Sequence, residues 1–328
     1  ESQGLPVVEA VGIVTKREHD LDAVLITRYL EFSLPYRLIL GGGDLPAPEP
    51  TIRAALAELL VRLHLAGLYW GDCSLSNALF RRDAGALSAY LVDAETSELH
   101  DRLSDGQRRH DLDIAEENLV GELMDLIAEL GHDVGEGDPL EFGLSVRRSY
   151  DDLWAELTSD EVFPTDEGHR LEERLRRLNE LGFDVEEVEL VSEGGEVRLV
   201  LQSKVVEPGH HRRRLLRLTG LEAQENQARR LLNDLTRYRA YLERKGDAPV
   251  SGTAAAARWL NEVFEPTIAA VPKELRGRRA AAEIFHELLE HRWFLSERAG
   301  KDVGLTETIP SYIDQVLRPA HDEKVSLG

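Results

Sequence analysis

Apolar residues recur at helical spacing through three long segments in the first half of the chain. Leucines fall on one face of residues 51–65, and a longer apolar row runs through residues 111–130. A third row runs through residues 140–157. This periodicity predicts three helices. The first is expected to end near Gly67, because glycine commonly terminates helices.

Shorter apolar runs in the same half predict strands. Two of these runs cover residues 6–15 and 23–30, and two more cover residues 78–80 and 89–92 around a turn at residues 81–85. The second pair is a predicted hairpin, with Asn77 just before its first strand and Asp93 just after its second. The side chains of Asn77 and Asp93 are therefore expected to meet at one end of the hairpin.

The second half is predicted to be mostly helical. A leucine row indicates a helix over residues 171–181, and alternating apolar residues around Gly194-Gly195 indicate a hairpin over residues 185–205. From His210 to Leu317 the pattern is almost all helical, and Trp259, Trp293 and Phe294 are expected in its core. Polar and proline-containing segments near residue 160 divide the chain into predicted domains 1–158 and 159–328.

The composition limits the possible partners. The chain has 328 residues and a formal net charge of −22, which argues against a general nucleic-acid or anionic-membrane surface. Its one basic cluster, residues 210–217, is either a phosphate contact or a basic helix end that pairs with this acidic chain. A single cysteine, Cys73, rules out an intrachain disulfide. No apolar run reaches membrane-spanning length, and the cytoplasm is the expected compartment.

Candidate chemistry centres on three residues in order: Asp72, Asn77 five positions later, and Asp93 after an apolar strand. Phosphoryl transfer from a nucleotide needs a carboxylate near the acceptor hydroxyl and oxygen ligands for magnesium, and an Asp, an Asn and a second Asp supply them in kinases. The alternative is structural, because Asp and Asn also cap turns and end strands.

The stretch from His64 through Gly67, Gly71, Asp72 and Asn77 to Leu91-Val92-Asp93 resembles the catalytic core of the protein-kinase-like superfamily, in particular its lipopolysaccharide (Kdo) kinase and aminoglycoside phosphotransferase branches. The resemblance covers roughly residues 5–130. It implies an α+β fold: a kinase-like large lobe with a partial small lobe, followed here by a mostly helical α+β accessory domain.

The resemblance also implies ATP and magnesium as cofactors. Asp72 would be catalytic, and Asn77 and Asp93 would bind the metal. The segment Tyr29, Leu30, Glu31 and Phe32, which leads into a hinge-like sequence, would lie along the adenine. His64 and Asp111 would support the catalytic loop, although Asp111 or Asp113 could equally interact with the start of the predicted helix.

Residues 284–297 resemble a bacterial domain of unknown function that is found behind such kinase-like segments, and this second resemblance implies no chemistry. Within it, His286 and His291 have a spacing that either suggests metal ligands or belongs to an ordinary helix.

The chain departs from the kinase pattern near its start. No Gly-rich phosphate loop and no strand lysine precede the hinge-like segment, Lys16 comes too late in the order, and Gly41 to Asp44 is expected to be a loop. Either an N-terminal portion is missing from this sequence or the protein is a degenerate relative. The functional hypotheses are therefore a kinase acting on an unidentified hydroxyl acceptor, or an inactive pseudokinase-like nucleotide-binding or interaction scaffold. A nucleic-acid module using the Arg212 cluster is a third, less favoured, hypothesis.

Overall fold

The computed structural model describes residues 5–15, 23–40, 49–130, 138–158, 161–164, 183–185, 188–193, 196–201, 206–246, 249–301 and 303–320. By their contacts, these residues form two compact units. Unit 1 contains the residues up to Arg81 and those from Leu87 to Trp154. Unit 2 contains the short segment Arg82–Ala86 and the residues from Ala155 onward.

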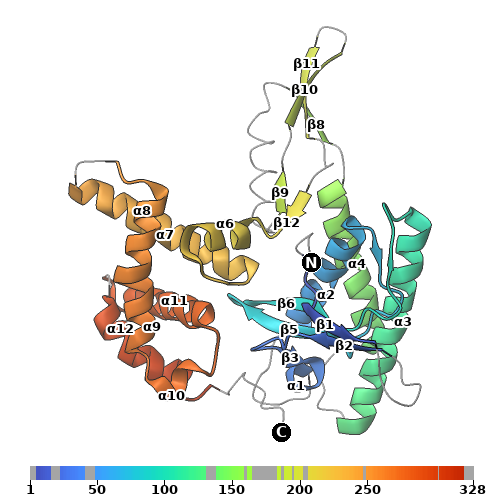
Figure 1. The fold of residues 1–328 in the computed structure, drawn as a ribbon, viewed down its shortest axis with the longest axis horizontal. Helices are drawn as coiled ribbons and strands as arrows, with labels where there is room; N and C mark the ends of the chain where they lie inside the picture. The colour runs from blue at the N-terminus through green and yellow to red at the C-terminus, as the bar shows by residue number, and fades with distance from the viewer. Residues whose placement is uncertain are drawn as a thin grey trace. The chain divides into compact units, whose positions relative to one another are not determined.

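Unit 1 combines small antiparallel sheets with helices (Figure 1). Strand β1 pairs with β2, and β3, β5 and β6 form a three-stranded sheet in the order β3-β5-β6. A third pair joins β4 to β7. The bounds of these strands are β1 Ala10–Val14, β2 Val24–Thr27, β3 Leu34–Pro35, β4 Leu68–Tyr69, β5 Ala78–Asp83, β6 Ala86–Leu91 and β7 Glu98–Leu99. Both strands predicted near the start of the chain are present and shorter than expected.

The predicted hairpin is confirmed as β5 and β6, with longer strands and a tighter turn. Its connection consists of Ala84 and Gly85, whose φ angles are 53° and 86°. Positive φ at both central residues is the geometry of a two-residue turn whose twist matches that of the strands it joins. The turn is therefore confined to these two residues, and the expected longer turn over residues 81–85 is wrong.

Unit 1 contains helices α1 Tyr36–Leu40, α2 Glu49–Leu65 and α3 Asp105–Leu130, together with α4 Pro139–Thr158 as far as Trp154. All three predicted helices are present, and α3 and α4 run alongside each other in Figure 1. Leu56, Leu60 and Leu63 of α2 are completely buried. Their side chains belong to the buried core of unit 1.

Helix α3 begins six residues before the predicted start. Ser104 and Gln107 form a reciprocal cap: the Ser104 hydroxyl accepts the Gln107 N–H at 3.2 Å, and the Gln107 side-chain oxygen accepts the Ser104 N–H at 3.0 Å. Asp111 consequently lies in the second turn of α3 and does not cap the helix, which corrects one of the two interpretations of that residue.

Unit 2 begins with small strands. β8, β10 and β11 form a sheet in the order β10-β11-β8, and β9 pairs with β12. Their bounds are β8 Glu161–Pro164, β9 Phe183–Val185, β10 Val188–Glu193, β11 Glu196–Leu201 and β12 Val206–Pro208. The predicted hairpin is confirmed as β10 and β11, which pair antiparallel from Val188–Leu201 to Glu193–Glu196.

The rest of unit 2 is helical, as predicted from His210 onward (Figure 1). Its elements are α6 His210–Thr219, α7 Glu225–Gly246, α8 Gly252–Trp259, a π-helical turn Leu260–Phe264, α9 Glu265–Ala270, α10 Lys273–Arg276, α11 Ala281–Ala299, α12 Leu305–Tyr312 and a second π-helical turn Ile313–Leu317. Trp259, Phe264 and Phe285 pack together with ring centroids 5.1–5.6 Å apart.

The core prediction holds for Trp259, which is completely buried, and is wrong for Trp293 and Phe294, which are 57% and 50% exposed. In the part of the chain that the structure describes, none of the helices is long and apolar enough to cross a bilayer. Several predictions lie outside the described residues: Lys16, the loop Gly41 to Asp44, the helix over residues 171–181, the turn Gly194-Gly195 and the residues 159 and 160 near the domain boundary.

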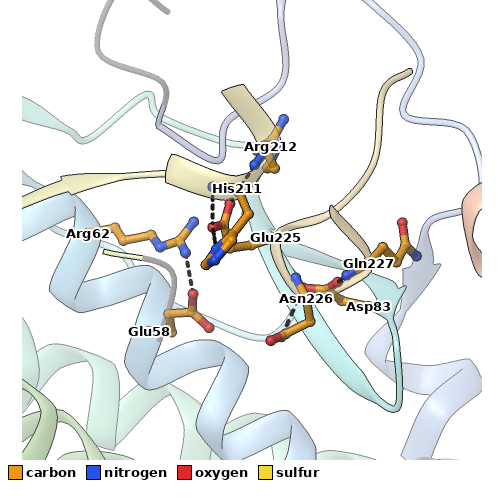
Figure 2. A network of polar contacts seen from close by, with 8 residues as sticks. All are labelled: Glu58, Arg62, Asp83, His211, Arg212, Glu225, Asn226 and Gln227. Carbon is orange, nitrogen blue, oxygen red and sulfur yellow. Dashed lines mark hydrogen bonds and ion pairs between the residues drawn. The ribbon is translucent and has the colours of Figure 1, made fainter. Parts of the chain in front are cut away.

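Two buried carboxylates organise the start of α7 in unit 2. Asp83, 1% exposed, accepts the backbone N–H groups of Asn226 and Gln227 at 3.1 and 2.8 Å (Figure 2). Glu283, 3% exposed, accepts the Ala84 N–H at 3.0 Å and the Gln227 side-chain amide at 2.7 Å. The tip of the β5–β6 hairpin thus supplies the acceptor for N–H groups that have no partner within the helix at its start.

Glu225, the first residue of α7, holds the start of α6 in the same way. It accepts the N–H groups of His211 and Arg212 and a ring nitrogen contact from His211 at 2.6 Å (Figure 2). The first turn of the basic cluster is therefore anchored on an acidic residue, as the helix-end interpretation expects. A phosphate-binding role for the remaining arginines stays a prediction.

Candidate functional site

Two glycines shape the approach to the loop that carries Asp72. Gly67 and Gly71 both have φ of +79°, a conformation that side chains other than glycine rarely adopt. A Cβ atom on Gly67 would lie 2.1 Å from the carbonyl oxygen of His100, and one on Gly71 would lie 3.0 Å from that of Thr96. Glycine at both positions therefore lets the chain before Asp72 pass directly against the backbone that follows Asp93.

Asp111 of α3 binds the backbone at the start of this loop. Its completely buried carboxylate accepts the Trp70 N–H and the Gly71 N–H, each at 2.8 Å. The same carboxylate contacts Nε2 of buried His64 at 2.9 Å. The structure thus brings together His64 and Asp111, the two residues predicted to support the loop, and their role in catalysis stays a prediction.

A chain of polar contacts continues behind His64. Its Nδ1 lies 2.8 Å from the Tyr150 hydroxyl, which accepts a hydrogen bond from Arg108 at 3.3 Å. Burial raises the pKa of Tyr150 well above its usual value, so its hydroxyl keeps its proton. When the Tyr150 hydroxyl donates to Nδ1 and Nε2 of His64 donates to Asp111, each donor from Arg108 to Asp111 faces an acceptor.

The carboxylate of Asp72 is oriented by two side-chain amides. The Asn77 Nδ2 group donates to Asp72 Oδ2 at 2.9 Å, and the Asn118 Nδ2 group donates to Asp72 Oδ1 at 2.9 Å. Asn77 also donates to the Asp72 carbonyl at 3.1 Å. These amides fix the direction of the carboxylate. Because Asp72 is only half-buried, the carboxylate remains accessible to a substrate.

Backbone contacts connect Asn77 and Asp93 to the same loop. The Asn77 carbonyl accepts the Val92 N–H at 3.1 Å, and the Asp93 carbonyl accepts the indole N–H of Trp70 at 3.2 Å. Asp93 is exposed, and its Oδ1 accepts the Glu95 N–H at 2.9 Å. The three residues of the candidate site therefore belong to one hydrogen-bonded cluster in unit 1.

Helix α3 contributes two further residues that the sequence analysis missed. Asn118 binds Asp72, and Glu122 accepts the N–H groups of Leu75 and Ser76 at 2.6 and 3.2 Å. Asp111, Asn118 and Glu122 are spaced by seven and four residues, which places them on one face of a helix. That polar row is visible in the sequence and would have identified the face of α3 that supports the loop.

The remaining predicted residues lie beside this cluster or apart from it. Cys73 is completely buried, and burial raises the pKa of its thiol well above the usual value, so it is a structural residue. The segment Tyr29 to Phe32 precedes β3, which pairs with β5 through Leu34 and Phe80. This pairing brings the hinge-like segment to the sheet that contains the hairpin, and its role toward adenine stays a prediction.

The histidine spacing in unit 2 shows no sign of a metal site. His291 Nε2 contacts the Ser311 hydroxyl at 2.9 Å, while His286 lines a cavity with residues of α7. Among the residues that the structure describes, no three His, Cys, Asp or Glu side chains gather as a metal-binding group.

Comparison with known proteins identifies the second half of the chain. The family model described as "Domain of unknown function (DUF4032)" matches residues 152–317, half of the chain. This chain belongs to that family. The DUF4032 match contains all of α6 to α12 and assigns them no chemistry. No protein of curated function matches the sequence.

Among solved structures, this DUF4032 protein is similar to one described as "WaaP in complex with acyl carrier protein". The two share 18% sequence identity at a TM-score of 0.34, over 55% of this chain and 71% of the other. A likeness at this level carries no argument about function. The case for chemistry at Asp72 therefore rests on the geometry of unit 1.

Proposed function

We propose that unit 1 binds Mg-ATP and transfers its terminal phosphoryl group to a hydroxyl of an acceptor molecule. The observation that carries the proposal is the double amide contact to Asp72 within a loop that α3 holds at four backbone N–H groups. A carboxylate fixed in this way, and still accessible, suits the orientation of an acceptor hydroxyl and the acceptance of its proton.

Asn77 and Asp93 fit the metal that this reaction requires. The Asn77 amide nitrogen faces Asp72, so its oxygen points away from Asp72 and is available to a cation. One Asp93 oxygen accepts the Glu95 N–H, and the exposed carboxylate retains further acceptor capacity. Magnesium prefers such oxygen ligands and takes the rest from phosphates and water. When bound, the ion would neutralise charge on the phosphates of ATP.

A nucleotide-binding scaffold without transfer is the second candidate. The given sequence before the hinge-like segment at residues 29–32 contains no Gly-rich phosphate loop and no lysine in the position that kinases use to hold the phosphates. Without such groups the triphosphate would be held mainly through the metal, and the affinity would be weak. The two candidates share the metal site and differ in whether Asp72 acts on an acceptor.

Two variants test the proposal. Asp72→Asn should reduce ATP turnover by at least about 100-fold and spare Mg-ATP binding, because Asp72 acts on the acceptor and not on the metal. Asp93→Asn should weaken Mg-ATP binding itself. Isothermal titration of ATP in the presence of Mg²⁺ or of EDTA measures binding, and an assay of ADP release measures turnover. Asp113→Asn is the matched control, since Asp113 is an exposed aspartate of α3 outside the loop contacts.

The outcomes separate the candidates. Mg-dependent ATP binding that Asp93→Asn weakens, together with turnover that Asp72→Asn removes, supports transfer. The same binding without turnover in the unaltered protein supports the scaffold. ATP binding that is absent, or that is equal with and without Mg²⁺, contradicts both.

A further inference from the structure

Unit 2 contains a cavity of about 340 Å³ between helices α7 and α11. Helix α7 contributes Arg230, Asn233, Asp234 and Arg237 to its wall. These positions are three, four and seven residues apart, so they share one face of the helix. Arg230, Asn233 and Arg237 are exposed, so this polar row forms the side of the cavity that is open to solvent and to a ligand.

The opposite wall comes from α11 at the same spacing and consists of His286, Leu289, Glu290 and Trp293. Leu289 and Trp293 form an apolar part of the cavity, and Trp293 is 57% exposed. Glu290 is exposed. The volume falls at the lower end of the range for small-molecule sites, which begins at about 300 Å³. The cavity thus suits a ligand of few atoms with both a polar and a flat apolar part.

His286 is the buried polar group of this cavity. It is 2% exposed, and among the described residues neither ring nitrogen has a hydrogen-bond partner. The residue lines the cavity, where a ligand can reach its ring. Burial and then the charge of Arg230 lower the pKa of His286 to about 4. The ring is therefore neutral near pH 7, with one donor and one acceptor that a ligand can satisfy.

Among the described residues no carboxylate forms an ion pair with Arg230 or Arg237, in a chain with 61 acidic and 39 basic residues. The charge of Arg237 does act on Asp234 in the same wall, where it opposes the rise in pKa that burial causes. Other arginines nearby do pair, such as Arg239 with Glu243 on the same helix. The acid in the wall, Asp234, accepts the indole N–H of buried Trp259 at 2.8 Å and is thereby tied to the core.

We propose that this cavity binds a small organic anion in which a phosphate or carboxylate group is attached to a flat ring. Arg230 and Arg237 would hold the anionic group, because guanidinium groups bind both kinds of oxygen anion through several hydrogen bonds. His286 would satisfy one polar atom of the ligand. Trp293 would cover the ring, since an exposed indole offers a flat apolar surface.

Phenyl phosphate and benzoate are suitable probes, and benzyl alcohol is the uncharged control. Ligand-observed NMR and isothermal titration on the full chain should show binding of at least one anion, with Kd on the order of 1 mM for molecules of this size. Benzyl alcohol should bind at least about tenfold more weakly. A preference between the two anions would identify the natural ligand as a phosphate or a carboxylate.

Variants assign the binding to this cavity. Arg230→Gln and His286→Leu should each weaken anion binding about tenfold or more, and Arg230→Gln changes only an exposed residue. Arg239→Gln removes a charge from the same helix outside the cavity and should have no effect. Asp93→Asn should also have no effect, which separates this site from the proposed nucleotide site. Failure of both anions to bind, or equal binding by the Arg230→Gln variant, would overturn the proposal.

Discussion

Removal of the Asp111 carboxylate should release the loop that carries Asp72. Asp111 accepts three hydrogen bonds, and two of the donors, His64 Nε2 and the Trp70 N–H, are buried. Each buried donor left without an acceptor costs about 1–3 kcal/mol. Water can reach the half-buried Gly71, so its loss is smaller. Asp111→Ala should therefore destabilise unit 1 by about 4 kcal/mol.

Asp111→Asn should cost about half as much, roughly 2 kcal/mol. One oxygen of the Asp111 carboxylate faces His64 and Trp70, and the other faces Gly71. The Asn side chain keeps one acceptor oxygen and places an NH₂ donor where the other oxygen was. The effect should be local, because the loop can open while the rest of the unit stays folded. An opening that is 2 kcal/mol easier corresponds to about 30-fold faster amide exchange at Trp70 and Gly71.

Hydrogen exchange of the peptide covering residues 66–77, beside urea denaturation of the whole chain, measures both quantities. Asp113→Asn is the control, because Asp113 is exposed on the same helix and pairs with Arg147 at the surface. A surface pair of this kind contributes about 1 kcal/mol or less. If Asp111→Ala stays within about 1 kcal/mol of the unaltered protein and exchange at Trp70 is unchanged, the loop is held by other contacts and the reasoning fails.

Three further predictions concern single positions. Gly67→Ala should lower the free energy of unfolding by more than about 3 kcal/mol, because its Cβ would clash with the His100 carbonyl. Gly85 also has positive φ but lies in open space, so Gly85→Ala should cost about 1 kcal/mol. Equal losses of stability in thermal denaturation would contradict the clash. Cys73 should react with a thiol reagent only in denaturant, since its thiol is buried and its pKa is raised; rapid labelling of the native chain argues against this. The pKa of His286 is about 4 in the folded chain and 6.5 in its usual state, so its contribution to stability is complete above pH 6.5. That contribution should be lost as the pH falls toward 4, by up to about 3 kcal/mol. Stability curves of His286→Leu should lack this part of the decline, and parallel curves for the two proteins would refute it.

The helices were predictable where apolar residues repeat without interruption, as in α2, α3 and α4. The start of α3 was missed. A serine followed three residues later by a glutamine is the sequence signal of the reciprocal cap that Ser104 and Gln107 form. Trp293 and Phe294 show the opposite limit. Periodicity identifies the apolar positions of a helix, and it does not tell whether another element covers them.

The candidate site divides in the same way. The contact between Asp72 and Asn77 joins residues five apart in one loop, so local spacing anticipates it. The role of Asp111 depended on where α3 begins and on which loop crosses it. The buried carboxylates of Asp83 and Glu283 have partners 143 and 199 residues away. Contacts of that separation depend on the folded chain and leave no periodic signal in the sequence.

The tip of the β5–β6 hairpin has a consequence for how this protein can be cut. A fragment starting at Ala155 contains α7 and Glu283 but lacks Asp83 and Ala84. The N–H groups of Asn226 and Gln227 then lose their acceptor, Asp83, and buried Glu283 loses the Ala84 N–H donor. The second half of the chain is therefore complete only with a five-residue insert from the first. A short hairpin peptide spanning residues 78–91 is the natural complement for that fragment, so that the two pieces together restore what a single cut removes.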